Sequence, residues 1–160
     1  METQIRGVSL DLGKTRTGIA CWRDQQLQWV EVASFASTTT LGETLSTFSN
    51  WLALWVKADT DWIAYEQRMT GGARLGGRHL EIHYGMVGAL HLRAWHLGIP
   101  ILSIPIGTAK KALAGNGRAD KDAMLAAAQE RYPQHDVLEH DVADAIAVGL
   151  AALSRIELPK

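Results

Sequence analysis

Two aspartates three residues apart stand before a long apolar segment near the end of the chain. The segment 145–153 contains no proline and predicts a helix whose first turn carries Asp141 and Asp144. Residues three apart share one face of a helix, so the two carboxylates would project together. A helix N-terminus favours a carboxylate, which explains either acid alone. Two close carboxylates, however, repel each other unless a proton or a cation lies between them, so the pair suggests a cation site.

Two further acids end predicted strands. Asp11 ends the apolar segment 5–11, and Glu66 ends the segment 61–66. Each acid alone is as consistent with a cap or a salt bridge as with catalysis. In an open α/β sheet, however, functional side chains gather at the carboxyl ends of strands. If these two strands are neighbours, both acids point into one site, and the helix that carries the aspartate pair can complete it.

Four carboxylates would form an oxygen-only set of ligands, which suits Mg²⁺ or Mn²⁺. Two such ions about 3.5–4 Å apart can activate water and stabilise the leaving oxygen in phosphodiester cleavage. We therefore expect two ions per site, held by the catalytic residues Asp11, Glu66, Asp141 and Asp144. His140 is a candidate accessory residue, as a general base or beside the metal, and the alternative is a solvent-facing residue before the helix.

Length and composition bound the class of protein. The 160 residues are 47% hydrophobic and 21% charged, an ordinary balance that predicts a single domain over 1–160. The single cysteine, Cys21, excludes an internal disulfide and a cysteine zinc site, and it fits a reducing compartment. No segment approaches the roughly 18 apolar residues of a membrane span, and the N-terminus lacks a signal-peptide pattern. We expect a cytoplasmic protein without a membrane partner.

The charge is unevenly distributed along the chain. Residues 67–121 contain eight Lys and Arg against two acids, a net +6, so the remainder carries −7 of the total of −1. Four of the six histidines also lie in this segment. A basic middle between acidic flanks suits a polyanion bound near a cation site. Ordinary solvated faces are the alternative on charge alone.

The hydrophobic pattern predicts the order of the elements. Three strands joined by short turns form an antiparallel meander. The expected elements are strands 5–11, 17–22 and 27–35, helix 41–56, strand 61–66, a glycine-rich basic loop 67–78, helix 79–97, strand 101–104, helices 108–114 and 120–131, and the final helix. In helix 79–97, Gly85 and Gly88 each cost about 1 kcal/mol relative to alanine. They indicate close approach of another element, from this chain or a second subunit. His79 and His83 lack the glutamate of a zinc protease, so zinc is not expected.

Four segments, spread over nearly the whole chain, together resemble the RuvC family of Holliday-junction resolvases. The first is Gly7-Val8-Ser9-Leu10-Asp11-Leu12-Gly13 with Thr17-Gly18, and the second is Ile63-Ala64-Tyr65-Glu66-Gln67. The third is the basic segment from Lys110 to Lys121, which includes Gly115 and Gly117-Arg118-Ala119-Asp120. The fourth is Asp141-Val142-Ala143-Asp144-Ala145-Ile146-Ala147. The last two segments are the most specific.

The resemblance implies an α/β RNase H-like fold, a five-stranded mixed sheet flanked by helices. It implies a Mg²⁺-dependent endonuclease that nicks two strands of a four-way junction symmetrically, leaving 5′-phosphate and 3′-hydroxyl ends. It also implies a homodimer through helix 79–97 and allows a branch-migration motor as a partner. The candidate DNA-binding residues are Lys110, Lys121, Arg118, Arg68, Met69, Arg74 and Arg78.

The chain departs from the family at Met69, where an aromatic residue usually follows the glutamate by three positions. Methionine can wedge between bases but stacks less well. The chain is also less basic overall than bacterial members. Both features favour a divergent or phage member that acts, in a bacterial cell or a phage-infected host, on a broader range of branched DNA.

Two other classes of function remain open. The start Asp11-Leu12-Gly13-Lys14-Thr15 resembles the first phosphate loop of ATPases and sugar kinases, which need a second loop and usually two domains. A nuclease of the same fold that acts on RNA precursors shares the Asp-x-Gly-x-Thr start. It lacks the Glu-Gln strand end and the Asp-x-x-Asp pair. A binding protein that lost cleavage is disfavoured because all four acids are present.

Overall fold

A computed structural model describes residues 4–68 and 77–156. In chain order the elements are β1 (Arg6–Leu12), β2 (Arg16–Arg23), β3 (Gln26–Ser34), α1 (Leu41–Trp55), β4 (Trp62–Gln67), α2 (Gly77–Leu97), β5 (Ile101–Pro105), α3 (Ile106–Ala114), α4 (Lys121–Arg131), the short 3₁₀ helix η1 (Pro133–His135) and α5 (His140–Leu153). Every predicted element is present. Helices α2 and α3 each begin two residues earlier than predicted. Most of the loop expected over 67–78 lies outside the described residues.

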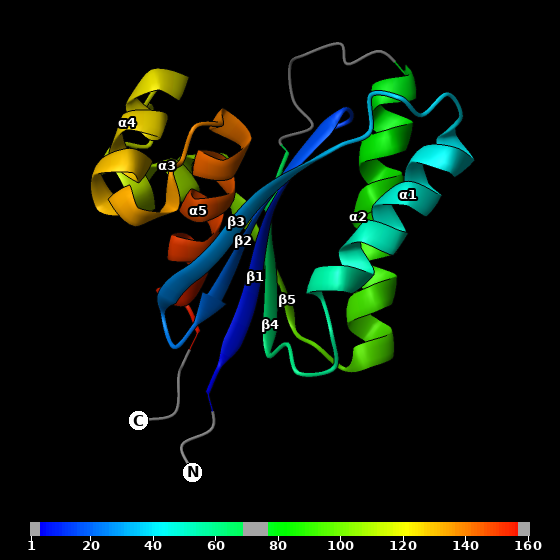
Figure 1. Ribbon diagram of the computed structural model, residues 1–160, viewed down its shortest axis with the longest axis horizontal. Coiled ribbons are helices and arrows are strands. Elements are labelled where there is room, and N and C mark those ends of the chain that lie inside the picture. The colour runs from blue at the N-terminus through cyan, green and yellow to red at the C-terminus, as the bar shows by residue number, and fades with distance from the viewer. Residues whose placement is uncertain (1–3, 69–76, 157–160) are drawn as a thin grey trace.

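The five strands form one mixed sheet in the order β3-β2-β1-β4-β5. Strands β1 to β3 are an antiparallel meander, whereas β1 pairs with β4 and β4 with β5 in parallel. Helices α1 and α2 lie on one face of the sheet, and α3, α4 and α5 lie on the other (Figure 1). The predicted fold class, a five-stranded mixed sheet flanked by helices, is confirmed.

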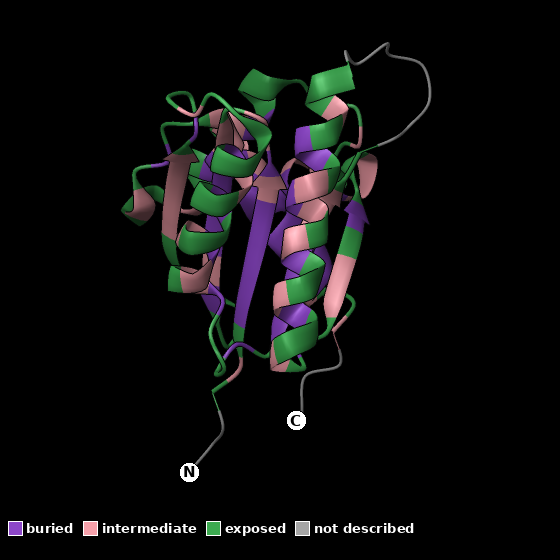
Figure 2. Ribbon diagram, turned by 90° about the vertical axis from the view of Figure 1, so that its right-hand side faces the viewer, coloured by how far each residue is buried: buried purple, intermediate pink, exposed green. Residues whose placement is uncertain are grey.

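Side-chain alternation along the strands separates two hydrophobic cores. On β1, Val8, Leu10 and Leu12 pack in the core under α1 and α2. The other residues of β1 therefore face the opposite layer, where Ala20, Trp22 and the small residues of α5 form the second core. The helices expose their outward sides while the central strands behind them are buried (Figure 2).

The two glycines of α2 have different surroundings. A Cβ atom at Gly85 would lie 2.8 Å from the Leu45 side chain of α1, so this glycine permits a close helix crossing within the chain. A Cβ atom at Gly88 would meet nothing within 4 Å. Around Gly88 the helix exposes Tyr84, Leu92 and Trp95, at 51%, 60% and 82% of their surfaces. The close approach predicted from these glycines is therefore intramolecular at Gly85 only.

No helix within residues 4–68 and 77–156 is both long enough and apolar enough to cross a membrane.

Candidate active site

The strand register brings Asp11 and Glu66 to the same level of the sheet. Leu10 of β1 pairs with Tyr65 of β4 in a parallel register, so the next residue on each strand is the acid. Asp11 faces the α5 layer, because its neighbours Leu10 and Leu12 face the opposite one. Trp62 and Ala64 of β4 lie in the core on the α5 side, and Glu66 continues that alternation. The expectation that these two strands are neighbours is confirmed.

Helix α5 is fixed to the sheet by polar and close backbone contacts beside these acids. The buried Ser9 hydroxyl donates to the Ala145 carbonyl at 2.7 Å and accepts from the Trp22 indole N–H at 2.8 Å. Gly18, which pairs with Asp11 across β1 and β2, lies directly under the start of α5. A Cβ atom at Gly18 would come within 2.0 Å of the Asp141 carbonyl oxygen. The first turn of α5 is therefore held beside Asp11, at the carboxyl ends of β1 and β4 (Figure 1).

The environment of Asp11 is unfavourable for a negative charge. Burial by surrounding protein raises the pKa of its carboxyl well above the ordinary value, and the charges of Glu66, Asp144 and Asp141 raise it further. Only Arg68 acts in the opposite direction. The Asp11 residue nevertheless retains some exposed surface, so solvent still reaches it. The structure thus brings all four predicted acids close enough to affect one carboxyl.

Two of the other acids have shifted pKa values for the same reasons. Burial, with a contribution from Asp144, raises the pKa of Glu66 to about 7, against the opposing charges of Arg68 and Lys110. Burial also raises the pKa of Asp144, while Lys121 and Lys110 lower it. A buried carboxyl group that resists ionisation favours a proton or a bound cation as its neighbour.

The two predicted phosphate-binding lysines both lie near Asp144. Lys110 of α3 donates from Nζ to the Ala119 carbonyl at 2.6 Å, which ties α3 to the turn before α4. Asp120 caps α4 by accepting from the Ala123 N–H at 2.8 Å, and Lys121 is the first residue of that helix. The local hydrogen bonds therefore place both ammonium groups near the acids, where they lower the pKa of Asp144.

His140 connects the start of α5 with α4. Its Nδ1 atom lies 3.2 Å from the Lys121 carbonyl oxygen, and its charge is among the influences that lower the pKa of Asp144. His140 is thus a neighbour of the acids, as its sequence position predicted. Its contact is with the backbone of the lysine segment.

The remaining predicted DNA-binding residues are spread more widely. Arg68 is close to the acids and donates to the Leu12 carbonyl at 3.4 Å. Arg118 is exposed before α4, where its backbone N–H donates to Asn116. Arg78 donates to the Thr39 carbonyl at the entrance to α1. Met69 and Arg74 lie outside the described residues.

Sequence reasoning missed two polar residues, Arg16 beside the acids and His83 in α2. The Arg16 guanidinium lies 3.1 Å from the Asp141 carboxylate and also pairs with Glu139. His83 of α2 is buried, its Nδ1 atom has no hydrogen-bond partner, and burial followed by the charge of Arg68 lowers its pKa. Strand alternation could have indicated Arg16, which is two residues before Gly18. No local signal distinguishes His83 from the other histidines of its helix.

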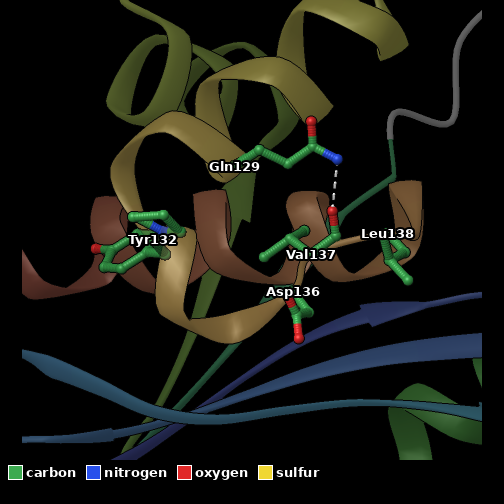
Figure 3. A pocket seen from close by; sticks show the side chains of 6 residues that line it. Gln129, Tyr132, Asp136, Val137 and Leu138 are labelled. Atoms are coloured by element: carbon green, nitrogen blue, oxygen red, sulfur yellow. Dashed lines mark hydrogen bonds between the residues drawn. The ribbon is translucent and has the colours of Figure 1, made fainter.

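Two pockets of the described surface lie apart from the acids. A pocket of about 260 Å³ lies between α4, η1 and the segment before α5, where the Gln129 amide donates to the Val137 carbonyl at 2.7 Å (Figure 3). A second one, of about 420 Å³, lies between α3 and α4 and includes Arg118. Neither contains a predicted catalytic acid.

The chemistry of the donor set fits a hard divalent cation, because all four groups are carboxylates and three have raised pKa values. In the arrangement of the described residues, no three His, Cys, Asp or Glu side chains surround a common point closely enough to hold one ion. Carboxylates that share a site repel one another. The described geometry is therefore an electrostatic cluster rather than a closed set of metal ligands.

Comparison with known proteins finds likeness in structure only. No family model and no curated protein matches the sequence. Thermus thermophilus RuvC aligns with a TM-score of 0.72 at 18% identity over 92% of both chains. The same protein in complex with a Holliday junction substrate aligns at 0.75 and 19%, again over 92% of both chains. The yeast mitochondrial Holliday junction resolvase Ydc2 aligns at 0.63 and 11%, over 92% of this chain and 77% of that one.

These alignments define the chain as an α/β protein of the RNase H-like fold. Within that class, its arrangement is the one found in RuvC-type Holliday-junction resolvases. The resemblance inferred from four sequence segments is thus confirmed at the level of the fold.

Proposed function

We propose that the chain is a Mg²⁺-dependent endonuclease that cleaves Holliday junctions or other branched DNA, as a divergent member of the RuvC family. The observation that carries the proposal is the convergence of four carboxyl groups from β1, β4 and α5 beside two lysines. The charges of Glu66, Asp144 and Asp141 all raise the pKa of the buried Asp11 carboxyl, and the two lysines lower the pKa of Asp144. The fold, shared with resolvases, supports the same conclusion.

The acids Asp11, Glu66, Asp141 and Asp144 would hold two Mg²⁺ or Mn²⁺ ions. Bound ions would activate water and stabilise the leaving oxygen of a phosphodiester, giving 5′-phosphate and 3′-hydroxyl ends. The protein itself supplies buried carboxyl groups that Lys110, Lys121 and Arg68 keep partly compensated. Because Glu66 ionises at about pH 7, cation binding would compete with its protonation.

The substrate would be DNA with a branch. Lys110 and Lys121 would contact phosphate close to the scissile bond, since both already act on the acids there. The contact along the backbone would be extended by Arg68, Arg74, Arg78 and Arg118, whereas Met69 would wedge between bases at the branch. Such phosphate contacts fix orientation without reading sequence. A branch-migration motor would deliver the junction in the cytoplasm of a bacterial cell or a phage-infected host.

Symmetric cleavage of two strands requires two active sites related by a twofold axis. We place the dimer contact on the outward face of α2, where Tyr84, Leu92 and Trp95 are exposed around Gly88. Large apolar side chains in one stripe are typical of an interface, and a glycine with open space outside it admits a second helix closely. Trp95→Glu should therefore shift the protein from dimer to monomer in sedimentation equilibrium.

The decisive experiment is cleavage of an immobile four-way junction, a three-way junction and a plain duplex, each with Mg²⁺ and with chelator. Paired symmetric nicks in the four-way junction alone, dependent on Mg²⁺, would establish a resolvase. Equal cutting of three-way junctions would identify a broader debranching nuclease. Absence of cutting by the folded protein would contradict the proposal and direct the tests to RNA substrates and ATP.

A further inference from the structure

Arg16 is the first residue of β2 and the closest cationic partner of Asp141 in the described structure. Its Nε atom lies 3.1 Å from Oδ2 of Asp141, and its Nη2 atom lies 2.6 Å from Oε2 of Glu139. Both acids belong to the start of α5, where Glu139 is the N-cap residue and Asp141 is in the first turn. One guanidinium thus bridges a proposed metal ligand and an acid outside the proposed set.

The backbone around Arg16 permits this reach. Gly13 lies in the turn between β1 and β2, and a Cβ atom there would come within 2.2 Å of the Arg16 carbonyl oxygen. Gly18, two residues after Arg16 and on the same face of β2, carries the backbone of Asp141 directly above it. The arginine is therefore directed along the sheet toward the first turn of α5 by two positions that only glycine fits.

The two contacts of Arg16 are unequal. Its bond to Glu139 has good hydrogen-bond geometry, and that bond is the largest cause of the raised pKa of Arg16. Toward Asp141, by contrast, Nε is close in distance but remains without a hydrogen-bond partner although it is buried. The contact with Asp141 is therefore mainly electrostatic. A stronger positive charge can replace an unbonded counter-ion more easily than a hydrogen-bonded one.

We propose that Arg16 is the internal counter-ion of Asp141 in the metal-free protein, that an incoming divalent cation displaces it, and that Glu139 retains it afterwards. Arg16 would thereby set the cation affinity of the site, and Glu139 would lower the cost of releasing Asp141. The inference rests on the proposed function, because it takes Asp141 as a metal ligand.

The test is calorimetric titration of the metal-free protein with Mn²⁺, a readout independent of cleavage. Arg16→Met should bind Mn²⁺ roughly three- to tenfold more tightly, because a positive charge that competes for Asp141 is gone. It should also melt at a lower temperature in chelator and gain more from Mn²⁺ than the wild type does. Arg16→Lys, which keeps the charge, should bind Mn²⁺ about as the wild type does.

Glu139→Gln should have the opposite effect. Without its hydrogen-bonded partner, Arg16 would turn fully to Asp141, and Mn²⁺ would bind several-fold more weakly. In a protein that already carries Arg16→Met, Glu139→Gln should weaken Mn²⁺ binding clearly less than it does in the wild type. This non-additivity distinguishes the proposed mechanism from the simple loss of a negative charge. If Arg16→Met does not fold, Glu139→Gln and the lysine variant still carry the test.

Arg6→Met is the matched control. Arg6 and Asp59 form an ion pair with exposed fractions of 44% and 55%, similar to the 41% and 50% of Arg16 and Glu139, on the same sheet. This variant should leave Mn²⁺ binding unchanged. Unchanged or weaker Mn²⁺ binding by Arg16→Met would overturn the inference while leaving the metal site intact. A wild-type protein that binds no Mn²⁺ would overturn the proposed function and this inference with it.

Discussion

The two faces of the sheet are built on different principles. On the α1 and α2 side, the core consists of large apolar side chains such as Leu10, Phe48 and Met86. On the α5 side, the helix is rich in alanine and lies against the strands through glycines, and a buried serine bonds it to the sheet. The first face can tolerate small shifts because apolar contacts are non-directional. The α5 face, by contrast, holds its helix at one fixed distance from the sheet, because hydrogen bonds and close backbone contacts are directional or leave no room.

The acids are found on the second face, and the difference explains why. Catalysis and metal binding need side chains held within a fraction of an ångström. The positions of Asp141 and Asp144 are set by the contacts that α5 makes with Ser9 and Gly18. The other face contributes stability, and in our proposal the outer side of α2 is the surface for association. Variants should therefore separate stability from activity according to the face they alter.

The largest effect is expected from Asp11→Asn. Cleavage should fall by roughly a thousandfold or more, since loss of a proposed metal ligand would remove several kcal/mol of transition-state stabilisation. Junction binding should persist or tighten, because one negative charge near phosphate is gone. Rates and gel-shift affinities on a four-way junction measure both. Leu90→Ala, in the core of the other face, is the control and should lower stability by about 2–5 kcal/mol without altering the rate of the folded fraction.

The second effect concerns pH and the Glu66 carboxyl, whose pKa is raised from 4.5 to about 7 in the folded protein. The folded state therefore holds this proton more tightly than the unfolded state. Stability from this group is complete below pH 4.5 and is lost as pH rises to about 7, by up to about 3 kcal/mol.

Chemical unfolding of the metal-free protein between pH 4.5 and 8 measures this loss. Glu66→Gln should reduce the loss of unfolding free energy between pH 4.5 and 8. Saturating Mg²⁺ should offset this loss in the wild type only. A wild type and a Glu66→Gln variant with parallel pH profiles would show that Glu66 ionises normally.

A smaller effect is expected from Gly18→Ala. Its new methyl group would meet the Asp141 carbonyl oxygen at 2.0 Å, so the start of α5 must move, at about 1–3 kcal/mol of stability. Cleavage per folded molecule should fall as well, because the aspartates move with the helix. Gly42→Ala in α1, where a Cβ atom meets nothing within 4 Å, should instead leave activity unchanged. Retained activity in Gly18→Ala would show that α5 adjusts without displacing its acids.

Much of this arrangement could be predicted from local sequence. Helical spacing placed Asp141 and Asp144 on one face, and alternation placed Asp11 and Glu66 at the ends of strands. Their proximity depended on β1 and β4 being neighbours, which the parallel register confirms. The contact between Arg16 and Asp141 could not be predicted, because it depends on the distance at which α5 packs over β2. Gly85 and Gly88 also looked alike in sequence, and only the position of Leu45 distinguishes them.

The smallest effect should come from Lys121→Ala. Its ammonium group lies near Asp144 and, in our proposal, near a phosphate of the junction. Removing one phosphate contact lowers the slope of log K against log salt by about one, with a modest loss of affinity at low salt. Lys111→Ala is the matched control, because Lys111 is exposed on α3 and is not among the charges that shift the pKa values of Asp11, Glu66 and Asp144. An equal change in slope for both lysines would indicate a diffuse basic surface, whereas an unchanged slope for Lys121→Ala would place the DNA away from the start of α4.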